Sequence, residues 1–192
     1  MKKDTVFFRQ AELLPRVLPF VNEEEFFALK GGTAINFFFR DLPRLSIDID
    51  LTYLPINDRE TALTDIEKAL IRISERVEKT IPGVRVFFKR DREFNLVAGL
   101  LIRRGDATIK VEPNPVLRGS VFPTETRALC QKAQDLFELS IEARTLSFEI
   151  FTEERPVQLW TGSIRGTYST SICCSRMRDS RRKCARPLLS IL

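Results

Sequence analysis

The sequence predicts an α/β fold in which helices pack on a mixed β-sheet, and three observations support this. Residues 57–81 carry apolar side chains at helical spacing along one stripe. The three runs that follow, 84–90, 94–104 and 106–114, are rich in β-branched and aromatic residues, which favour strands. A chain of 192 residues, 43% of them hydrophobic and 30% charged, is long enough for one domain with a real core.

The N-terminal elements alternate between helix and strand. Residues 9–21 predict a short helix that breaks at Pro15, because proline removes a helical hydrogen bond. Residues 25–30 predict a strand that enters a turn at Gly31-Gly32. Thr33 is then the predicted N-cap of a helix that runs to residue 42.

The remaining elements complete the sheet and its helical cover. Residues 44–54 predict a strand in which apolar and polar side chains alternate. Residues 131–141 predict a further helix, and residues 144–149 a short edge strand. The apolar stripe of the long helix over 57–81 consists of Ala62, Ile66, Ala69, Leu70 and Ile73.

The positive charge of the chain is concentrated at its C-terminal end. The net charge is +5, and residues 150–192 hold eight Lys and Arg against three Asp and Glu, which accounts for all of it. Residues 1–149 hold 23 residues of each sign, so they lack the net basic field that indicates a nucleic-acid-binding protein. Residues 150–192 also show no helical or strand period. We therefore predict a domain over 1–149 and a poorly structured basic tail over 150–192.

Histidine is absent, and most cysteines lie in the tail. Without His, Ser-His and Cys-His catalysis are excluded. Cys130 stands alone in the body, and the spacing of Cys173, Cys174 and Cys184 is poor for a zinc site. No apolar run approaches the roughly 20 residues that span a bilayer, and the N-terminus lacks the pattern of a secretory signal. We expect a cytoplasmic protein without membrane association.

Two aspartates alternate with apolar residues in the stretch SIDIDL. In a strand, Ile47, Ile49 and Leu51 point to one face, and Asp48 and Asp50 emerge side by side on the other. Neighbouring carboxylates repel each other, and no Lys or Arg is interleaved to neutralise them. Because a divalent cation would relieve this repulsion, the pair predicts a metal site.

A glycine pair precedes the aspartates at a predicted strand-to-helix junction. At such a junction, free main-chain N–H groups and the helix dipole favour a phosphate, and Gly31 and Gly32 let the backbone approach it closely. A phosphate-binding turn beside a carboxylate pair is what metal-assisted phosphoryl or nucleotidyl transfer requires, because Mg²⁺ prefers carboxylate oxygens and substrate phosphates.

The segment TIKVEP contributes a third carboxylate to this hypothesis. Alternation places Thr108, Lys110 and Glu112 on one face of the predicted strand. If this strand pairs beside the strand of Asp48 and Asp50, Glu112 completes a carboxylate triad and Lys110 reaches a phosphate.

The stretches KGGTAINFFF and RLSIDIDLTY resemble the AbiEii/AbiGii abortive-infection toxin family of the polymerase-β-like nucleotidyltransferase superfamily. The family signature is a Gly-Gly or Gly-Ser turn, a spacer and Asp-x-Asp, and the resemblance covers roughly residues 8–149. It implies a nucleotidyltransferase-like core, Mg²⁺ or Mn²⁺ as cofactor, an NTP substrate, an RNA (such as tRNA) or protein acceptor, and a cognate antitoxin. It assigns Asp48, Asp50 and Glu112 to the metals and catalysis, Lys110 to catalysis and the nucleotide, and Gly31, Gly32 and Thr33 to the nucleotide.

Beyond Glu149 the chain departs from the family, whose members continue with a helical half that carries a motif like RDLFD. Shifted by one base from the codon of Glu149, residues 150–175 can be translated as DLYRGKTCAALDRQHPRDLFDIHLLF, which contains that motif. Only the wobble bases are free, and the codons of Trp160 and Thr161 must yield an aspartate. We infer a single-base deletion near this codon, and we expect the body to expose an apolar patch where the missing helical half would dock.

Two functions from different classes fit the sequence. The first is an AbiEii-like nucleotidyltransferase that is impaired by the missing half. The second is a non-catalytic module that retains the fold to bind a nucleotide or an antitoxin. A phosphohydrolase fits less well, because no residue is placed as a dedicated water-activating base.

Overall fold

The computed structural model describes residues 5–91 and 95–148 of the chain. The chain divides into two compact units, Met1–Pro156 and Val157–Leu192, and all described residues belong to the first. The tail predicted over 150–192 lies outside the described residues, so its lack of structure stays a prediction.

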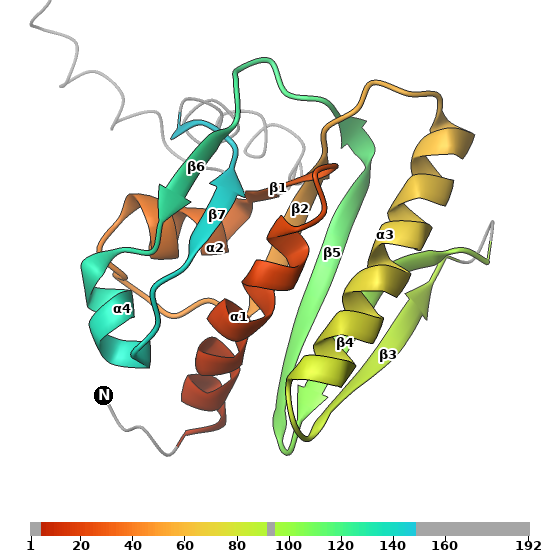
Figure 1. Ribbon diagram of the computed structural model, residues 1–192. Helices are drawn as coiled ribbons and strands as arrows, with labels where there is room; N and C mark the ends of the chain where they lie inside the picture. Colours follow the sequence, from red (N-terminus) through yellow and green to blue (C-terminus); the bar gives the residue numbers. More distant parts are fainter. Residues whose placement is uncertain (1–4, 92–94, 149–192) are drawn as a thin grey trace, which may run out of the picture. The chain divides into compact units, whose positions relative to one another are not determined.

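The first unit is built on a seven-stranded mixed sheet of order β3-β4-β5-β2-β1-β7-β6 (Figure 1). β2 pairs in parallel with β5, and β1 with β7, whereas the other neighbouring strands are antiparallel. This sheet confirms the predicted mixed α/β fold class. The strands are β1 (Phe27–Lys30), β2 (Asp48–Tyr53), β3 (Val84–Arg90), β4 (Val97–Arg104), β5 (Ala107–Arg118), β6 (Glu125–Ala128) and β7 (Glu142–Thr145).

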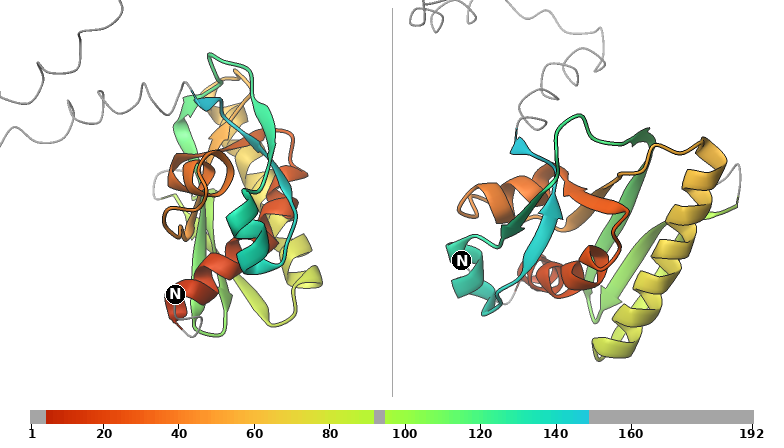
Figure 2. Two further views of the ribbon diagram at one scale, coloured as in Figure 1. Left: turned by 90° about the vertical axis from the view of Figure 1, so that its left-hand side faces the viewer. Right: turned by 45° about the horizontal axis from the view of Figure 1, so that its top comes forward.

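Two helices, α1 (Val6–Asn22) and α3 (Arg59–Thr80), lie side by side against one face of the sheet (Figure 2). α3 begins at its N-cap Asp58, whose carboxylate accepts a hydrogen bond from the Thr61 main-chain N–H at 2.9 Å. The predicted apolar stripe of α3 is buried along its whole length. No helix of the described residues is long and apolar enough to cross a membrane.

The prediction of a break at Pro15 is wrong, because α1 continues through both Pro15 and Pro19. One side of the helix packs against the core, where Ala11, Leu14 and Val17 are fully buried. Each buried Leu or Val contributes about 1.5–3 kcal/mol of transfer free energy, which offsets the roughly 3 kcal/mol that an interior proline costs.

The helix after β1 begins three residues earlier than predicted. α2 (Gly31–Ala34) starts at Gly31 with Lys30 at its N-cap position, and it continues as the π-helix η1 (Ile35–Phe39). Thr33 is therefore not an N-cap. Its side chain is fully buried and holds a different position, described below with the site.

The far end of the sheet also differs from the prediction. The strand predicted at the edge, β7, lies inside the sheet, and the edge is formed by β6, which the sequence did not indicate. β6 has only four residues, of which Thr126 and Ala128 are exposed. Arg127 of β6 stacks over the Phe39 ring at 4.1 Å. The connecting helix α4 (Gln131–Phe137) is shorter than predicted.

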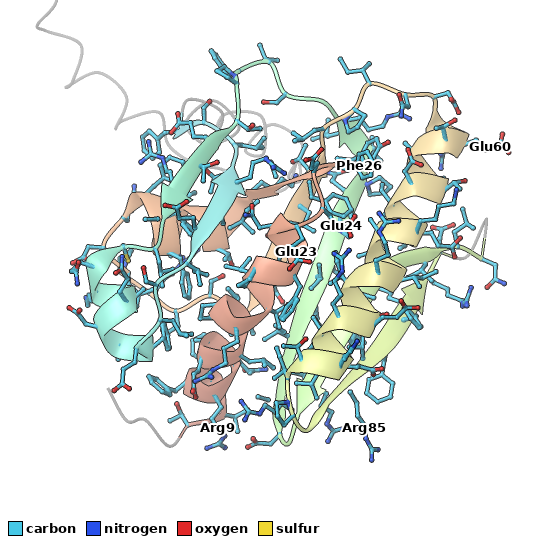
Figure 3. The ribbon with its side chains drawn as sticks, viewed as in Figure 1. Arg9, Glu23, Glu24, Phe26, Glu60 and Arg85 are labelled. Atoms are coloured by element: carbon cyan, nitrogen blue, oxygen red, sulfur yellow. The ribbon has the colours of Figure 1, made fainter. Side chains whose placement is uncertain are left out.

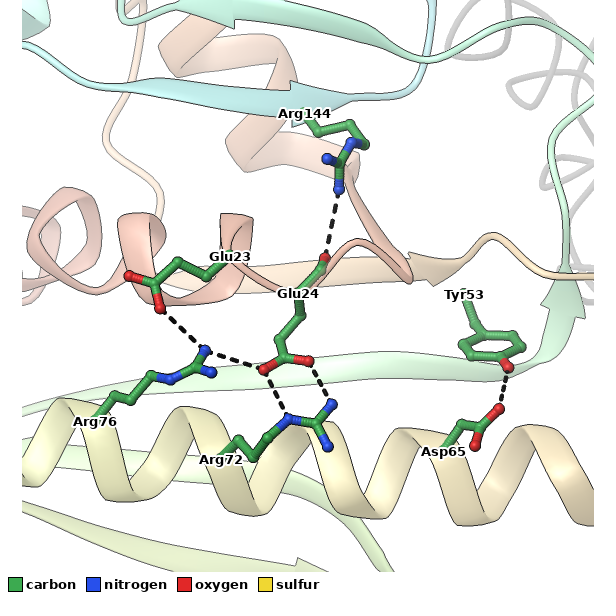
Figure 4. Close-up of polar contacts among 7 residues, drawn as sticks. All are labelled: Glu23, Glu24, Tyr53, Asp65, Arg72, Arg76 and Arg144. Carbon is green, nitrogen blue, oxygen red and sulfur yellow. Dashed lines mark hydrogen bonds and ion pairs between the residues drawn. The ribbon is translucent and has the colours of Figure 1, made fainter.

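A charged cluster joins the end of α1 to α3 (Figures 3 and 4). The Glu24 carboxylate is buried, and it accepts hydrogen bonds from Arg72 Nε at 3.0 Å and Arg76 Nη1 at 3.1 Å. Arg76 also pairs with Glu23 at 3.0 Å. Two charge-assisted partners satisfy a carboxylate that would otherwise be costly to bury, so the cluster fixes α1 against α3.

An exposed group of apolar side chains lies where β2 and β5 end. Ile56 is 89% exposed, Val116 77%, Leu117 56% and Val121 93%. The segments of these residues adjoin, because a Cβ built on Gly119 would lie 3.2 Å from Ile56 Cγ1. Exposed apolar residues were predicted, and their role as the docking surface of a missing helical half stays a prediction.

Candidate active site

Four predicted site residues lie on the face of the sheet opposite α1 and α3. In the parallel β2–β5 pair, Asp48 is opposite Lys110 and Asp50 is opposite Glu112. Ile49 and Leu51 are fully buried on the other side, as alternation requires. Partners in register project from the same face, so the carboxylates and Lys110 share the open face. The strand pairing that the sequence analysis assumed is present.

Gly31 brings the start of α2 onto the second aspartate. Its φ is +71°, in the left-handed region, and a Cβ built on it would lie 2.6 Å from Asp50 Oδ2. No other residue fits here without moving the carboxylate or straining the backbone. The predicted phosphate-binding turn and the predicted metal-binding strand are therefore in direct contact.

Thr33 ties this turn to β2 from inside the protein. Its hydroxyl donates a hydrogen bond to the main-chain carbonyl of Asp48 and lies 2.7 Å from Ser46 Oγ. The side chain is fully buried, so Thr33 fixes the position of the turn from inside and is not exposed at the surface of the site.

Gly32 is surrounded by hydrogen-bond donors of three side chains. A Cβ built on Gly32 would lie 3.6 Å from Arg44 Nη2, 3.9 Å from Ser46 Oγ and 4.0 Å from Asn36 Nδ2. Asn36 is 3% exposed, and its Nδ2 has no hydrogen-bond partner within the described part of the chain. A buried amide without a partner is costly, so this donor fits an acceptor from a ligand. The signal in the sequence was Asn36, a polar residue within the apolar run AINFFF.

The Asp50 carboxyl has a raised pKa. Burial is the main cause, the charge of Asp48 adds to it, Lys30 opposes it, and Glu112 adds a further small effect. Lys30 is the register partner of Asp50 in β1. Burial and the two neighbouring carboxylates make the ionised form of Asp50 costly, and a second positive charge beside it would reduce that cost. Carboxylate oxygens are donors that suit Mg²⁺ or Mn²⁺.

The third carboxylate is engaged elsewhere. Glu112 Oε1 accepts a hydrogen bond from Lys89 Nζ of β3 at 2.8 Å. Among the described residues, no three Asp, Glu or Cys side chains are grouped closely enough to hold a metal ion. Asp48 and Asp50 are thus the pair that fits a divalent cation, with Glu112 on the adjacent strand.

A pocket of about 430 Å³ lies next to the Gly32 side of this site. It is formed by the segment after η1 and by α4, and Arg44 lines it. Arg44 therefore borders both the pocket and the glycine turn. The other lining residues are Leu42, Pro43, Leu45, Lys132, Asp135 and Leu136.

The chain is similar to known proteins in sequence and in fold. The sequence profile of a family described as nucleotidyl transferase AbiEii toxin, type IV TA system, matches residues 12–160. Among solved structures, the nucleotidyltransferase toxin MenT4 from Mycobacterium tuberculosis is similar, with a TM-score of 0.57 and 13% identity over 80% of this chain. The matched part is 53% of MenT4, so this chain spans about half of that toxin. No curated protein matches.

Proposed function

This chain belongs to the AbiEii family of nucleotidyltransferase toxins of type IV toxin–antitoxin systems, and on that premise we propose that it transfers a nucleotide from an NTP to an RNA or protein acceptor, with Mg²⁺ or Mn²⁺ as cofactor. The observation that carries the proposal is the contact between Gly31 and Asp50, which joins a phosphate-binding turn to a carboxylate pair. A cognate antitoxin is the proposed protein partner.

Each side chain of the site has a separate task in this proposal. Asp48 and Asp50 hold the metal ion, which supplies a Lewis acid that stabilises charge on the reacting phosphate. Glu112 pairs with Lys89 on β3, so it would reach the metal ion only after it leaves that lysine. Asp48 and Asp50 repel an unaccompanied triphosphate, so on this proposal the nucleotide binds together with its cation.

The phosphates bind on the glycine side of the carboxylates. The first main-chain N–H groups of a helix have no partner within it, so on this proposal those at the start of α2, including that of Gly32, donate to the phosphates. Arg44 and Asn36 add side-chain donors next to Gly32, and Lys110 adds a positive charge beside Asp48. Arg44 also borders the adjoining pocket, which has room for part of a nucleotide.

The second candidate is a binding module that keeps the fold without catalysis. It follows from the interpretation that a single-base deletion near the codon of Glu149 has replaced the helical half of the family. A toxin that lacks its helical half retains the carboxylates and the glycine turn, yet it has lost any group that the other half brings to the acceptor. Binding of NTP without transfer is the expected behaviour of such a module.

Incubation of the full chain with each radiolabelled NTP, Mg²⁺, total RNA and a protein extract separates the two candidates. Label that enters RNA or protein in the wild type but not in Asp48→Asn supports the transferase. Asp48→Asn removes the negative charge that would bind the metal ion but leaves the core volume unchanged. Its fold should therefore be unchanged, which circular dichroism checks. Metal-dependent NTP binding without any labelling supports the binding module, and equal labelling by the variant refutes the role of Asp48.

A further inference from the structure

A lysine of β3, two strands away in the sheet, pairs with the third carboxylate of the site. Lys89 Nζ lies 2.8 Å from Glu112 Oε1, although β3 and β5 are not neighbours in the sheet. β4 lies between them, so the ion pair crosses a whole strand.

A glycine in β4 makes this crossing possible. Lys89 is opposite Gly99 in the β3–β4 register. A Cβ built on Gly99 would lie 3.8 Å from both Lys89 Cβ and Glu112 Cγ, and 3.0 Å from the Val111 carbonyl oxygen. Any larger side chain at this position would stand between the lysine and the glutamate. The open path therefore depends on the missing side chain of Gly99.

The pair is strong enough to orient Glu112 but weak enough to exchange. The Lys89 side chain is 59% exposed and the Glu112 side chain 38%, so water screens the attraction between them. Glu112 lies beside Asp50 across the β2–β5 pair, and its charge contributes to the raised pKa of Asp50. A cation that reaches the aspartates thus meets a third carboxylate that already has a partner.

We propose that Lys89 is a resident counter-cation that competes with the divalent metal ion for Glu112. The inference rests on the metal site of the proposed function. In the metal-free protein, Lys89 holds Glu112 and reduces the repulsion among the carboxylates. When the metal ion binds, Glu112 exchanges the ammonium for the metal, so Lys89 lowers the affinity of the site for free metal. Lys89 is a positioning residue that acts through Glu112.

Titration of the full chain with Mn²⁺, followed by electron paramagnetic resonance of the free ion, tests this without any measurement of transfer. Lys89→Met keeps the length of the side chain and removes its charge, and we expect Mn²⁺ to bind about 3- to 10-fold more tightly. Lys89→Arg should bind Mn²⁺ as the wild type does. Lys68→Met, on an exposed position of α3, is the matched control for loss of one positive charge and should have no effect.

A second pair of variants tests whether Lys89 acts through Glu112. In a Glu112→Gln background, Lys89→Met should change the Mn²⁺ affinity less than it does in the wild type, because the carboxylate for which the two cations compete is gone. An equal gain in both backgrounds would mean that Lys89 acts only as a distant charge, and the inference would fail.

The failure of the inference can be distinguished from the failure of the proposed function. Wild-type Mn²⁺ binding that is lost in Asp48→Asn but unchanged or weakened in Lys89→Met overturns the role of Lys89 and leaves the metal site intact. No specific Mn²⁺ binding by any of these proteins, with or without an NTP, overturns both.

Discussion

Substitution of the two adjacent glycines by alanine should have opposite consequences, and this separates the structural from the binding role of the turn. Gly31 has a φ of +71°, and a Cβ there would lie 2.6 Å from Asp50 Oδ2. Gly32 has no positive φ, and nothing lies closer than 3.6 Å to its Cβ position. Gly31→Ala should therefore destabilise the fold, and Gly32→Ala should not.

The expected magnitudes follow from these geometries. A left-handed alanine costs about 1–2 kcal/mol, and displacement of the Asp50 carboxylate adds to it. A loss of about 2 kcal/mol lowers the Tm of a domain of this size by roughly 4–8 °C. Alanine in place of glycine within a helix is neutral or stabilising by up to about 1 kcal/mol, so the Tm of Gly32→Ala should be unchanged or slightly raised.

Gly32→Ala, which should leave the stability unchanged, should weaken nucleotide binding. The methyl group of Gly32→Ala fills the space between Arg44, Ser46 and Asn36, where we place a phosphate. Loss of one hydrogen bond to a charged group costs about 1.5–3 kcal/mol, so the Kd for an NTP with Mg²⁺ should rise roughly 10- to 100-fold. Thermal unfolding by circular dichroism and isothermal titration with NTP measure the two effects on the same samples.

The double variant Gly31→Ala/Asp50→Ala tests the source of the Gly31 effect. It removes the carboxylate that the new methyl group would touch, so it should regain part of the lost Tm and keep only the backbone cost. Two results would refute the reasoning. One is a Gly32→Ala protein that is as unstable as Gly31→Ala, and the other is a stable Gly32→Ala protein that binds NTP like the wild type.

Two further predictions concern Asp50 and the end of the described chain. Because the folded-state pKa of Asp50 is raised, its ionised form opposes folding above the pKa that it has in the unfolded chain. Asp50→Asn should therefore raise the Tm of the metal-free protein at pH 7, with a gain that shrinks as the pH falls toward about 4; a constant gain would contradict this cause. Resequencing of the coding DNA across codons 145–155 should reveal a missing base. A gene with one base restored there should yield a longer protein that binds NTP more tightly, and an intact reading frame would refute the deletion.

Local sequence patterns predicted α3 and most of the strands correctly. The continuity of α1 and the presence of β6 depend on packing between distant parts of the chain. Some features depend only on the sequence of a few neighbouring residues, and the structure confirms them. They are the apolar stripe of α3, the strands β3 to β5 and the alternation of β2. α1 survives Pro15 only because its buried side contacts the core, which no window around the proline shows. β6 is too short and polar to carry a strand signal, and it exists because β7 offers it a partner.

The same distinction applies to the candidate site. The sequence indicated Asp48, Asp50 and the glycine turn because the chemistry of each lies within a few residues. The contact of Gly31 with Asp50 and the donors around Gly32 depend on how η1 and the segment after it fold back. The Lys89–Glu112 pair needs the register of three strands and a glycine in the middle one, so it could not be predicted from spacing.

The open face of the sheet carries balanced charges around the site. Lys30 is opposite Asp50, Lys110 is opposite Asp48, and Lys89 pairs with Glu112. A balanced site attracts neither a free dication nor a free triphosphate strongly, because each would unbalance the charges that surround it. A metal ion that displaces Lys89 from Glu112 would release one ammonium group, and a triphosphate needs such groups. On the proposed function each ligand would therefore improve the site for the other, and by linkage the factor by which NTP tightens metal binding should equal the factor by which the metal tightens NTP binding.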